Sequence, residues 1–248
     1  GNQTDNSFDS IQILIDNAKS GDSIYLQEKT YESNGTVINI DKDISIYGSK
    51  SADTILDAKQ QSSIFIISEN ANVNFFDLTL VNGKTTANGG AIDNNGNLII
   101  HSLKFINNTA YNWDKGKING DGGAINNNGT ITINHTTLQH NTANIGGAIN
   151  NNNGNLTITN TTLNNNTATW GGAIYNNEGG TITITNTTLQ HNTATRDGGA
   201  IENIFGTITI TNHTTLQYNN ATRDGGAIDN YYGNTIIYNS TLQYNTAN

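Results

Sequence analysis

The sequence predicts an all-β fold, a right-handed parallel β-helix of about nine coils that begins with a short capping helix. Two repeated motifs carry this prediction. The tetrapeptide Gly-Gly-Ala-Ile occurs six times, and each copy is followed at a similar distance by a Phe/Leu-x-x-Asn unit. The Gly-Gly-Ala-Ile copies begin at Gly89, Gly122, Gly146, Gly171, Gly198 and Gly225. A repeat of about 25 residues is typical of a solenoid, in which each coil stacks only on its neighbours.

Each repeat is interpreted as one coil. The double glycine has no Cβ and suits a sharp bend that needs positive φ. An Asn-rich corner such as Asn126-Asn127-Asn128-Gly129 follows, since Asn tolerates the left-handed backbone conformation. The next strand alternates, so that in Thr181–Thr185 the isoleucines face the core and the threonines face outward.

Equivalent positions of stacked coils form columns about 4.8 Å apart along the axis. The Asn of each Phe/Leu-x-x-Asn unit is therefore expected to form a ladder in which one side-chain amide donates to the next. Each rung is expected to contribute about 1 kcal/mol. The predicted ladder consists of Asn108, Asn141, Asn166, Asn192, Asn219 and Asn245.

The chain is divided into a capping segment, residues 1–21, and a β-helix, residues 22–248, with irregular coils over 22–88 and regular repeats over 89–248. A helix over 7–20 is expected, capped by Ser7 or Asp9. Its apolar face is predicted to hold Ile11, Leu14, Ile15 and Ala18. Strands are expected at 23–26, 37–40, 44–47, 63–67 and 72–80.

The last coil is expected to expose strand edges and an apolar disc that includes Ile228, Ile236 and Leu242. We therefore expect either that more coils continue beyond residue 248 in the native protein, or that a like subunit associates end to end through this coil.

The composition narrows the classes of partner. The 248 residues carry a net charge of −9, and no basic stripe is present to neutralise nucleic-acid phosphates. Residues 1–90 hold 12 of the 20 acidic and 6 of the 11 basic residues, so the repeat region is nearly uncharged. Its Asn- and Thr-rich surface suits neutral polymers and glycans. No apolar run is long enough to cross a bilayer, and the absence of Cys excludes disulfides.

The paired Gly-Gly-Ala-Ile and Phe/Leu-x-x-Asn units resemble the repeats of chlamydial polymorphic outer-membrane proteins. The coils are more similar still to large adhesin-like surface proteins of methanogenic archaea, and Ile11–Gly48 resembles the first coils of pectin-lyase-like β-helices. Five of the six Phe/Leu-x-x-Asn units have Leu, a departure from the chlamydial pattern. The resemblance covers nearly the whole chain and implies an extracellular, cell-surface protein whose signal and anchor regions lie outside this sequence.

The interval from Gly89 to Gly122 is about eight residues longer than the later ones, and the surplus falls in residues 111–121. An insertion in one coil maps to a loop on one side of a solenoid, commonly the functional side. The alternative is a loop that packs Trp113 on the rod. The candidate binding residues are Tyr111, Trp113, Asp114, Lys115, Trp170, Tyr218 and Tyr244.

Four acidic residues in adjacent coils form a second candidate site. Asp197 is expected to stack near Asp224, and Glu202 near Asp229. Carboxylates about 5 Å apart match the separation in retaining glycosidases, which would make these four the catalytic residues of an enzyme. Asp197 and Asp224 are also weak calcium candidates. The third interpretation is an Arg–Asp surface ladder without metal or cofactor.

Two further surface features have simpler explanations. Outward threonines at 157, 159, 181, 183, 185, 207, 209 and 211 form an array like that of ice-binding solenoids, although Thr is also a favoured strand residue. At least ten Asn-x-Ser/Thr sequons occur, many by chance in so Asn- and Thr-rich a chain, and glycosylation requires export. The glycosylation candidates are Asn34, Asn107, Asn134, Asn160, Asn186, Asn212 and Asn239.

These observations favour a cell-surface, adhesin-like scaffold that binds another cell, a glycan or a like subunit through its lateral faces. A polysaccharide lyase or glycoside hydrolase on the same fold is the alternative, and an ice-binding solenoid is a third interpretation.

Overall fold

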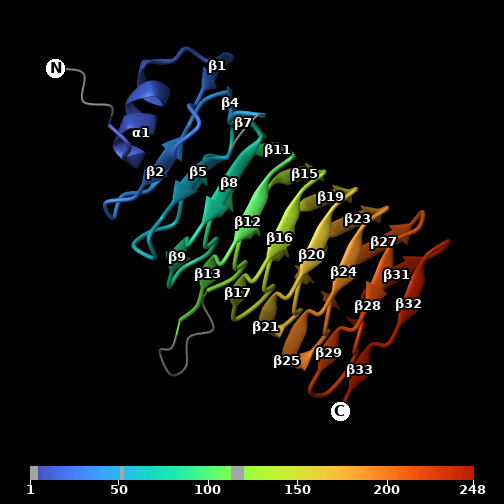
Figure 1. The fold of residues 1–248 in the computed structure, drawn as a ribbon. Coiled ribbons are helices and arrows are strands. Elements are labelled where there is room, and N and C mark those ends of the chain that lie inside the picture. Colours follow the sequence, from blue (N-terminus) through green and yellow to red (C-terminus); the bar gives the residue numbers. More distant parts are fainter. Residues whose placement is uncertain (1–4, 51–52, 113–119) are drawn as a thin grey trace.

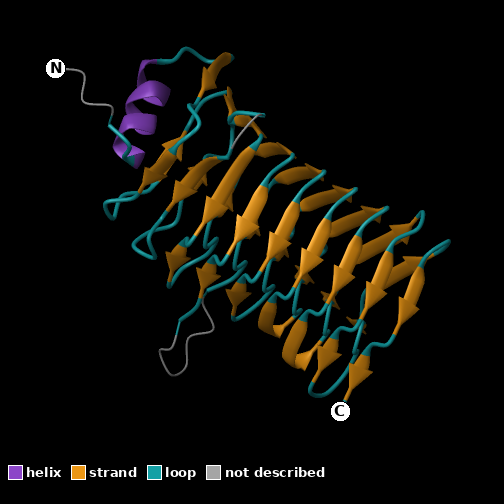
Figure 2. Ribbon diagram, in the orientation of Figure 1, coloured by secondary structure: helices purple, strands orange, loops and turns teal. Residues whose placement is uncertain are grey.

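The computed structural model describes residues 5–50, 53–112 and 120–248. The chain winds into a parallel β-solenoid with one short helix at its N-terminal end (Figure 1). It makes about eight turns between β1 and β31, which gives nine strands in each of the two longest sheets. Every strand pair is parallel among the described residues, and Figure 2 shows the strands stacked side by side along the rod.

Four sheets run the length of the rod, and in the regular coils the chain visits them in the order 1, 2, 3, 4. Sheet 1 consists of β1 (Asp22–Tyr25), β4 (Ile44–Tyr47), β7 (Asn72–Phe76), β11 (Asn97–His101), β15 (Thr130–Asn134), β19 (Asn155–Thr159), β23 (Thr181–Thr185), β27 (Thr207–Thr211) and β31 (Asn234–Ile237). Sheet 2 consists of β2 (Thr30–Glu32), β5 (Thr54–Asp57), β8 (Leu78–Val81), β12 (Lys104–Ile106), β16 (Thr137–Gln139), β20 (Thr162–Asn164), β24 (Thr188–Gln190), β28 (Thr215–Gln217) and β32 (Thr241–Gln243).

Sheets 3 and 4 are shorter and meet at the double glycines. Sheet 3 consists of β9 (Lys84–Thr85), β13 (Thr109–Ala110), β17 (Thr142–Ala143), β21 (Thr167–Trp170), β25 (Thr193–Asp197), β29 (Asn220–Ala221) and β33 (Thr246–Ala247). Sheet 4 consists of β3 (Ile38–Ile40), β6 (Phe65–Ile67), β10 (Ile92–Asn94), β14 (Ile125–Asn127), β18 (Ile149–Asn152), β22 (Ile174–Asn177), β26 (Ile201–Ile204) and β30 (Ile228–Tyr231). We refer to the turns between them as the 1/2, 2/3, 3/4 and 4/1 corners.

The helix α1 (Phe8–Asn17) covers the first coil and contacts β3. Ser7 caps the helix by accepting a hydrogen bond from the Ser10 N–H. Of the two predicted caps, Ser7 and Asp9, the structure therefore has Ser7. The predicted apolar face was partly wrong, because Leu14 is exposed and Phe8 is buried beside Ile11 and Ile15. Phe8 lies one turn before Ile11 and extends the same face.

The prediction of one strand over 72–80 was also wrong. The chain turns a corner at Asp77, whose φ is 54°, and β7 and β8 therefore belong to different sheets. The sequence pattern did not reveal this corner because Asp77 replaces the glycine or asparagine typical of such turns. The short strands β2 and β5 were not predicted at all.

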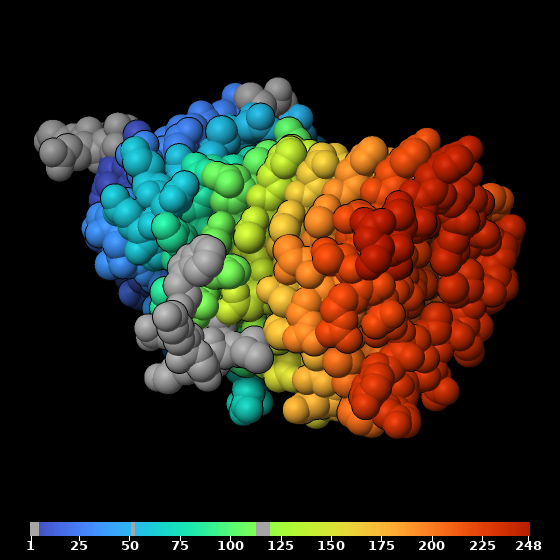
Figure 3. Space-filling model, turned by 90° about the horizontal axis from the view of Figure 1, so that it is seen from below, coloured from blue at the N-terminus to red at the C-terminus, as the bar shows by residue number. Residues whose placement is uncertain are grey.

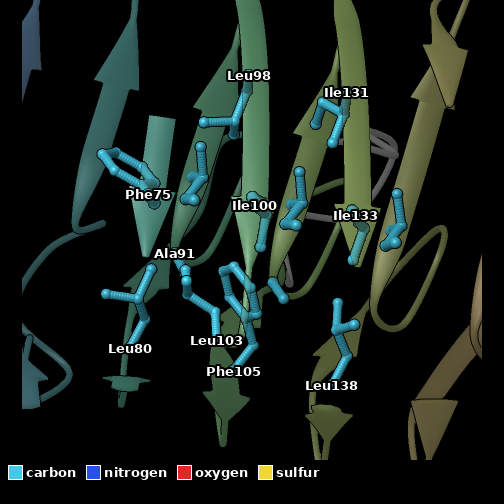
Figure 4. Packing of buried hydrophobic residues seen from close by; sticks show 14 of the residues in the cluster. Phe75, Leu80, Ala91, Leu98, Ile100, Leu103, Phe105, Ile131, Ile133 and Leu138 are labelled. Carbon is cyan, nitrogen blue, oxygen red and sulfur yellow. The ribbon is translucent and has the colours of Figure 1, made fainter. Parts of the chain in front are cut away.

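The core is a set of columns of inward side chains. Phe75, Ile100 and Ile133 stack on consecutive strands of sheet 1, as do Leu80, Phe105 and Leu138 on sheet 2 (Figure 4). All of these side chains are fully buried. The coils appear as successive bands along the rod in Figure 3.

The structure contains the asparagine ladder of the Phe/Leu-x-x-Asn units, at the 2/3 corner. The Asn166 Nδ2 donates to the Asn192 Oδ1 at 3.0 Å and to the Leu138 carbonyl, and the Asn166 N–H also donates to the Asn192 Oδ1. The other rungs repeat this pattern from Asn108 to Asn245. Each inner rung is therefore a buried amide with its donors and acceptor satisfied.

Two further ladders escaped the sequence analysis. The 4/1 corner, which sequence analysis treated only as an Asn-rich turn, holds a second buried amide column with Nδ2···Oδ1 distances of 2.6–2.8 Å. Its members are Asn94, Asn127, Asn151, Asn176, Asn203 and Asn230. At the 1/2 corner, buried threonine hydroxyls accept from the backbone N–H of the preceding coil, as in the Thr161 N–H donating to the Thr187 Oγ1. That column consists of Thr136, Thr161, Thr187 and Thr214.

The 3/4 corner depends on its two glycines for different reasons. Gly146 has φ of 64°, a conformation that costs other residues free energy. Gly147 lies so close to the next coil that a Cβ there would be 2.1 Å from the Gly172 carbonyl oxygen. The Gly-Gly pair is thus required by backbone conformation and by coil-to-coil contact.

The apolar disc of the last coil differs from the predicted one in one residue. Register pairs Thr209 with Ile236 and Ile210 with Ile237, so Ile237 occupies the inward column and Ile236 the outward one. Ile236 does not belong to the apolar disc because a single-residue shift along a strand changes the face.

Candidate functional site

The 3/4 corner brings together most of the acidic residues and both arginines of the repeat region. One wall carries Asp121, Ile145, Trp170 and Asp197 on adjacent coils. The facing wall, just after the glycines, carries one column on sheet 4. Its members are Asp93, Asn126, Asn150, Tyr175, Glu202 and Asp229.

Glu202 and Asp229 form a carboxyl pair. They are register partners on β26 and β30, and their side chains are hydrogen-bonded to each other. Glu202 is only 3% exposed, and burial is the main cause that raises its pKa to about 8, with the charges of Asp229 and Asp197 adding to the shift. Burial also raises the pKa of Asp229. At neutral pH the Glu202 carboxyl is therefore protonated.

Asp197 and Asp224 are joined through an arginine. The Arg223 Nε lies 3.7 Å from the Asp197 Oδ1, and the Arg223 Nη2 lies 3.8 Å from the Asp224 Oδ2. Asp197 is buried, whereas Asp224 is exposed. The arginine supplies the positive charge that two neighbouring carboxylates need, which is the Arg–Asp ladder considered from the sequence. Among the described residues no group of three or more His, Cys, Asp and Glu is placed to hold a metal ion.

The aromatic residues of the corner are in contact with charged groups. The Arg196 guanidinium lies 4.9 Å from the centre of the Trp170 ring, a cation–π contact, and the Arg196 Nε is 3.9 Å from the Asp197 Oδ2. Burial raises the pKa of Tyr175 to about 12, with further contributions from Glu202 and Asp121. Burial likewise raises the pKa of Asp121 to about 6.

The catalytic interpretation depends on the separation of the carboxyl groups. The two carboxyl groups of a retaining enzyme are about 5–5.5 Å apart and those of an inverting enzyme about 6.5–9.5 Å apart. Glu202 and Asp229 are register partners whose side chains interact with each other. The corner is a buried network that joins the last coils.

The insertion residues divide into two groups. Trp113, Asp114 and Lys115 lie outside the described residues. Tyr111 borders a hollow of about 490 Å³ above sheet 3, whose floor includes Thr109, Thr142 and Thr167.

Exposed aromatic rings gather at two other corners of the last coils. At the 2/3 corner His191, Tyr218 and Tyr244 form a parallel stack, with centroids 5.2 and 5.0 Å apart. At the 4/1 corner Phe205 and Tyr232 stack at 5.6 Å, and Tyr231 meets both rings edge-on. Phe205 was not predicted as a binding residue. Its position just before the glycine of an otherwise Asn-rich corner is the signal that sequence reasoning missed.

The candidate sequons and the threonine array lie where the coils turn or face outward. Asn160 and Asn186 belong to an amide column at the 1/2 corner, with the Asn186 Nδ2 donating to the Asn160 Oδ1. Asn34, Asn107, Asn186, Asn212 and Asn239 are exposed, and Asn134 and Asn160 are half-buried. The array is smaller than predicted because Thr211 is buried, with its Oγ1 3.2 Å from the Thr185 Oγ1.

Comparison with known proteins supports the fold and one repeat. Residues 160–177 match the Chlamydia polymorphic membrane protein repeat. The solved structure of AlyGC, a PL6 family alginate lyase, superposes with a TM-score of 0.52 at 14% identity, over 95% of this chain and 38% of the lyase. The chain thus spans well under half of that enzyme. No curated protein matches the sequence. These similarities define the chain as a repeat-built parallel β-solenoid.

Proposed function

We propose that this β-solenoid is a cell-surface, adhesin-like scaffold that binds neutral glycans through aromatic residues at the corners of its last coils. The match to a polymorphic membrane protein repeat supports the surface class, as do the coils that resemble archaeal adhesin-like proteins. Among the described residues no helix is both long and apolar enough to span a membrane.

The observation that carries this proposal is the backbone conformation of the exposed aromatic residues. Phe205, Tyr218, Tyr232 and Tyr244 have φ between 53° and 55°. Left-handed backbone is favourable for Gly and Asn but costs other residues about 1–2 kcal/mol. These rings are also 47–76% exposed, so burial does not compensate fully for that cost. Strained, exposed aromatic residues are typical of contact sites rather than of structural positions.

The chemistry of these corners suits an uncharged ligand. Within each stack the rings cover one another, so the surface offers ring edges and tyrosine hydroxyls. The neighbouring Gln190, Gln217 and Gln243 form a hydrogen-bonded amide ladder along the same side. Amide and hydroxyl groups beside aromatic carbon bind sugar hydroxyls and C–H groups, and they provide no cation for a polyanionic glycan.

Glycan-array and whole-cell binding tests this proposal. Replacing Phe205 and Tyr232 with Asn, or Tyr218 and Tyr244 with Asn, keeps a residue suited to the backbone and is expected to reduce binding at least tenfold. His140→Asn, at the equivalent corner three coils before Tyr218, is the matched control and is expected to bind normally. Unchanged binding by both double variants would contradict the proposal.

A carbohydrate-active enzyme is the second candidate, and the protonated Glu202 beside Asp229 favours it. A buried acid with a pKa of about 8 can act as a general acid at neutral pH. Release of reducing or unsaturated sugar ends from a polysaccharide panel, lost in Glu202→Gln, would establish this function. No release by the parent chain, or equal release by Glu202→Gln, would contradict it.

A like subunit is the further partner that we propose. In this chain β31, β32 and β33 lie at the ends of their sheets, and each pairs with one neighbour only. Since α1 covers the first coil, two copies would join through their last coils in a two-fold arrangement. Light scattering of the 248-residue chain is expected to show a dimer. Ile237→Lys with Leu242→Lys should convert it to a monomer, whereas Ile236→Lys on the outward face should have a smaller effect.

A further inference from the structure

A hollow at the opposite end of the rod lies outside every site considered so far. It occupies the 1/2 corner of the irregular coils, where β4, β7 and β11 end and β8 and β12 begin. One part, of about 550 Å³, is bordered by Tyr47, Phe76 and His101. A second part, of about 350 Å³, is bordered by Asp53, Thr79 and Lys104. Lys50, Asp77 and Ser102 border both parts, so the two parts lie side by side.

One wall of the hollow is aromatic. Tyr25, Tyr47 and Phe76 form a parallel stack, with the last two rings 4.6 Å apart and 6° from parallel. The stack ends at Phe76, because the His101 ring is 6.3 Å away and tilted by 47°. The His101 ring still lies within aromatic contact distance, so both faces of Phe76 are covered and the hollow meets the edges of the Tyr47 and Phe76 rings. Ring edges carry a partial positive charge, so they can pack against the hydroxyl oxygens of a sugar.

The other wall is polar and its formal charges balance. The Lys104 Nζ and the Asp53 Oδ1 form an ion pair at 3.2 Å. The Lys50 and Asp77 side chains add one positive and one negative group at the junction of the two parts. Two lysines and two aspartates supply donors and acceptors without a net charge that would select a cation or an anion.

The fold itself does not require these side chains. The column of Tyr47, Phe76 and His101 continues as Asn134, Thr159 and Thr185. Asp77 directly follows a sheet 1 strand, and the equivalent residues of later coils are Asn160 and Asn186. Lys104 begins a sheet 2 strand, and its register partners in every later coil are threonines. The later coils stack equally well with small polar residues, so the aromatic and charged residues of the first coils have another purpose.

We propose that this hollow binds a short neutral saccharide, with its ring beside the edges of Tyr47 and Phe76 and its hydroxyl groups on Asp77 and Lys50. The size of each part falls within the range of about 300–1,000 Å³ that is typical of small-ligand sites. The proposal rests on the ligand class of the proposed function but uses different residues, about five coils away from the exposed aromatic rings. The chain would thus hold a glycan at two separate places along its length.

Titration calorimetry with neutral gluco-, manno- and galacto-oligosaccharides of two to four units tests this site. A double variant, Asp77→Asn with Lys50→Gln, is expected to weaken binding of the selected saccharide at least tenfold. Asn tolerates the left-handed conformation of Asp77, so the fold should survive, which circular dichroism will verify. Glu69→Gln, an exposed acid of the same coil outside the hollow, is the matched control and should stay within twofold of the parent chain.

Three results would overturn the proposal: no binding by any neutral saccharide, unchanged binding in the double variant, or tighter binding of uronate oligosaccharides than of neutral ones. The Phe205→Asn, Tyr232→Asn chain separates this site from the proposed function. It should keep calorimetric saccharide binding at the hollow while losing cell binding. Loss of calorimetric binding in that chain would place the saccharide at the last coils instead.

Discussion

The irregular coils of residues 22–88 and the regular coils of residues 89–248 fill the same corners in different ways. At the 4/1 corner, Ile40 and Ile67 occupy the column that continues as Asn94 and Asn127. At the 1/2 corner, the column runs from Thr54 through the buried Leu78 and Leu103 to the threonine ladder that begins at Thr136. The first coils thus bury apolar side chains at several positions where the later ones bury hydrogen-bonded ladders.

This difference explains why only one part of the sequence is repetitive. An apolar corner tolerates any side chain of suitable volume, so successive coils can differ. An amide ladder requires Asn at the same position in every coil, because each rung must find a partner above and below. The regular repeat is therefore a consequence of ladder geometry. Variation in the regular coils is left to outward positions, where the exposed aromatic residues lie.

The largest expected effect is the loss of a ladder rung. Asn192→Ala removes a fully buried amide that accepts from the Asn166 side chain and donates to Asn219 and to the Leu163 carbonyl. We expect a loss of about 2–3 kcal/mol in the free energy of unfolding, since neighbouring buried groups lose their partners. Urea denaturation measures it. Asn177→Ala, a half-buried residue beside the second ladder, should cost less than about 0.5 kcal/mol, and equal losses would show that the ladder is not a stabilising element.

A second effect, on the dependence of stability on pH, is expected from the carboxyl pair of the regular coils. The pKa of Glu202 is raised from 4.5 in the unfolded chain to about 8 in the folded one. Between these values the folded state binds more protons than the unfolded state, so stability falls as pH rises from about 4.5 to 8. Glu202→Gln should flatten this dependence and raise stability at pH 8. Melting temperatures of both chains from pH 4 to 9 provide the measurement, and parallel profiles would contradict the assignment.

Sequence reasoning succeeded where a feature repeats and failed where it is local. The period of Gly-Gly-Ala-Ile predicted the parallel solenoid, and the Phe/Leu-x-x-Asn spacing led to the ladder from Asn108 to Asn245. The second ladder was missed because Asn127 and Asn151 lie within runs of Asn, where the buried member cannot be distinguished from exposed ones. The carboxyl pair was placed by register, but its hydrogen bond and the bridging role of Arg223 depend on side-chain conformation.

The smallest expected effect concerns the left-handed corner that carries Glu178, Phe205 and Tyr232, all with φ near 54°. Glu178→Asn replaces an exposed residue with one suited to this backbone and should stabilise the chain by about 0.5–1 kcal/mol. Tyr232→Asn gains the same stabilisation from the backbone conformation but loses the stack of Tyr232 on Phe205, which contributes about 0.5–1.5 kcal/mol. Its net change in the free energy of unfolding should therefore be near zero. The difference between the two variants in thermal denaturation measures the stack. A large destabilisation by Tyr232→Asn would mean that the aromatic corner is structural, and it would remove the main support for a binding role.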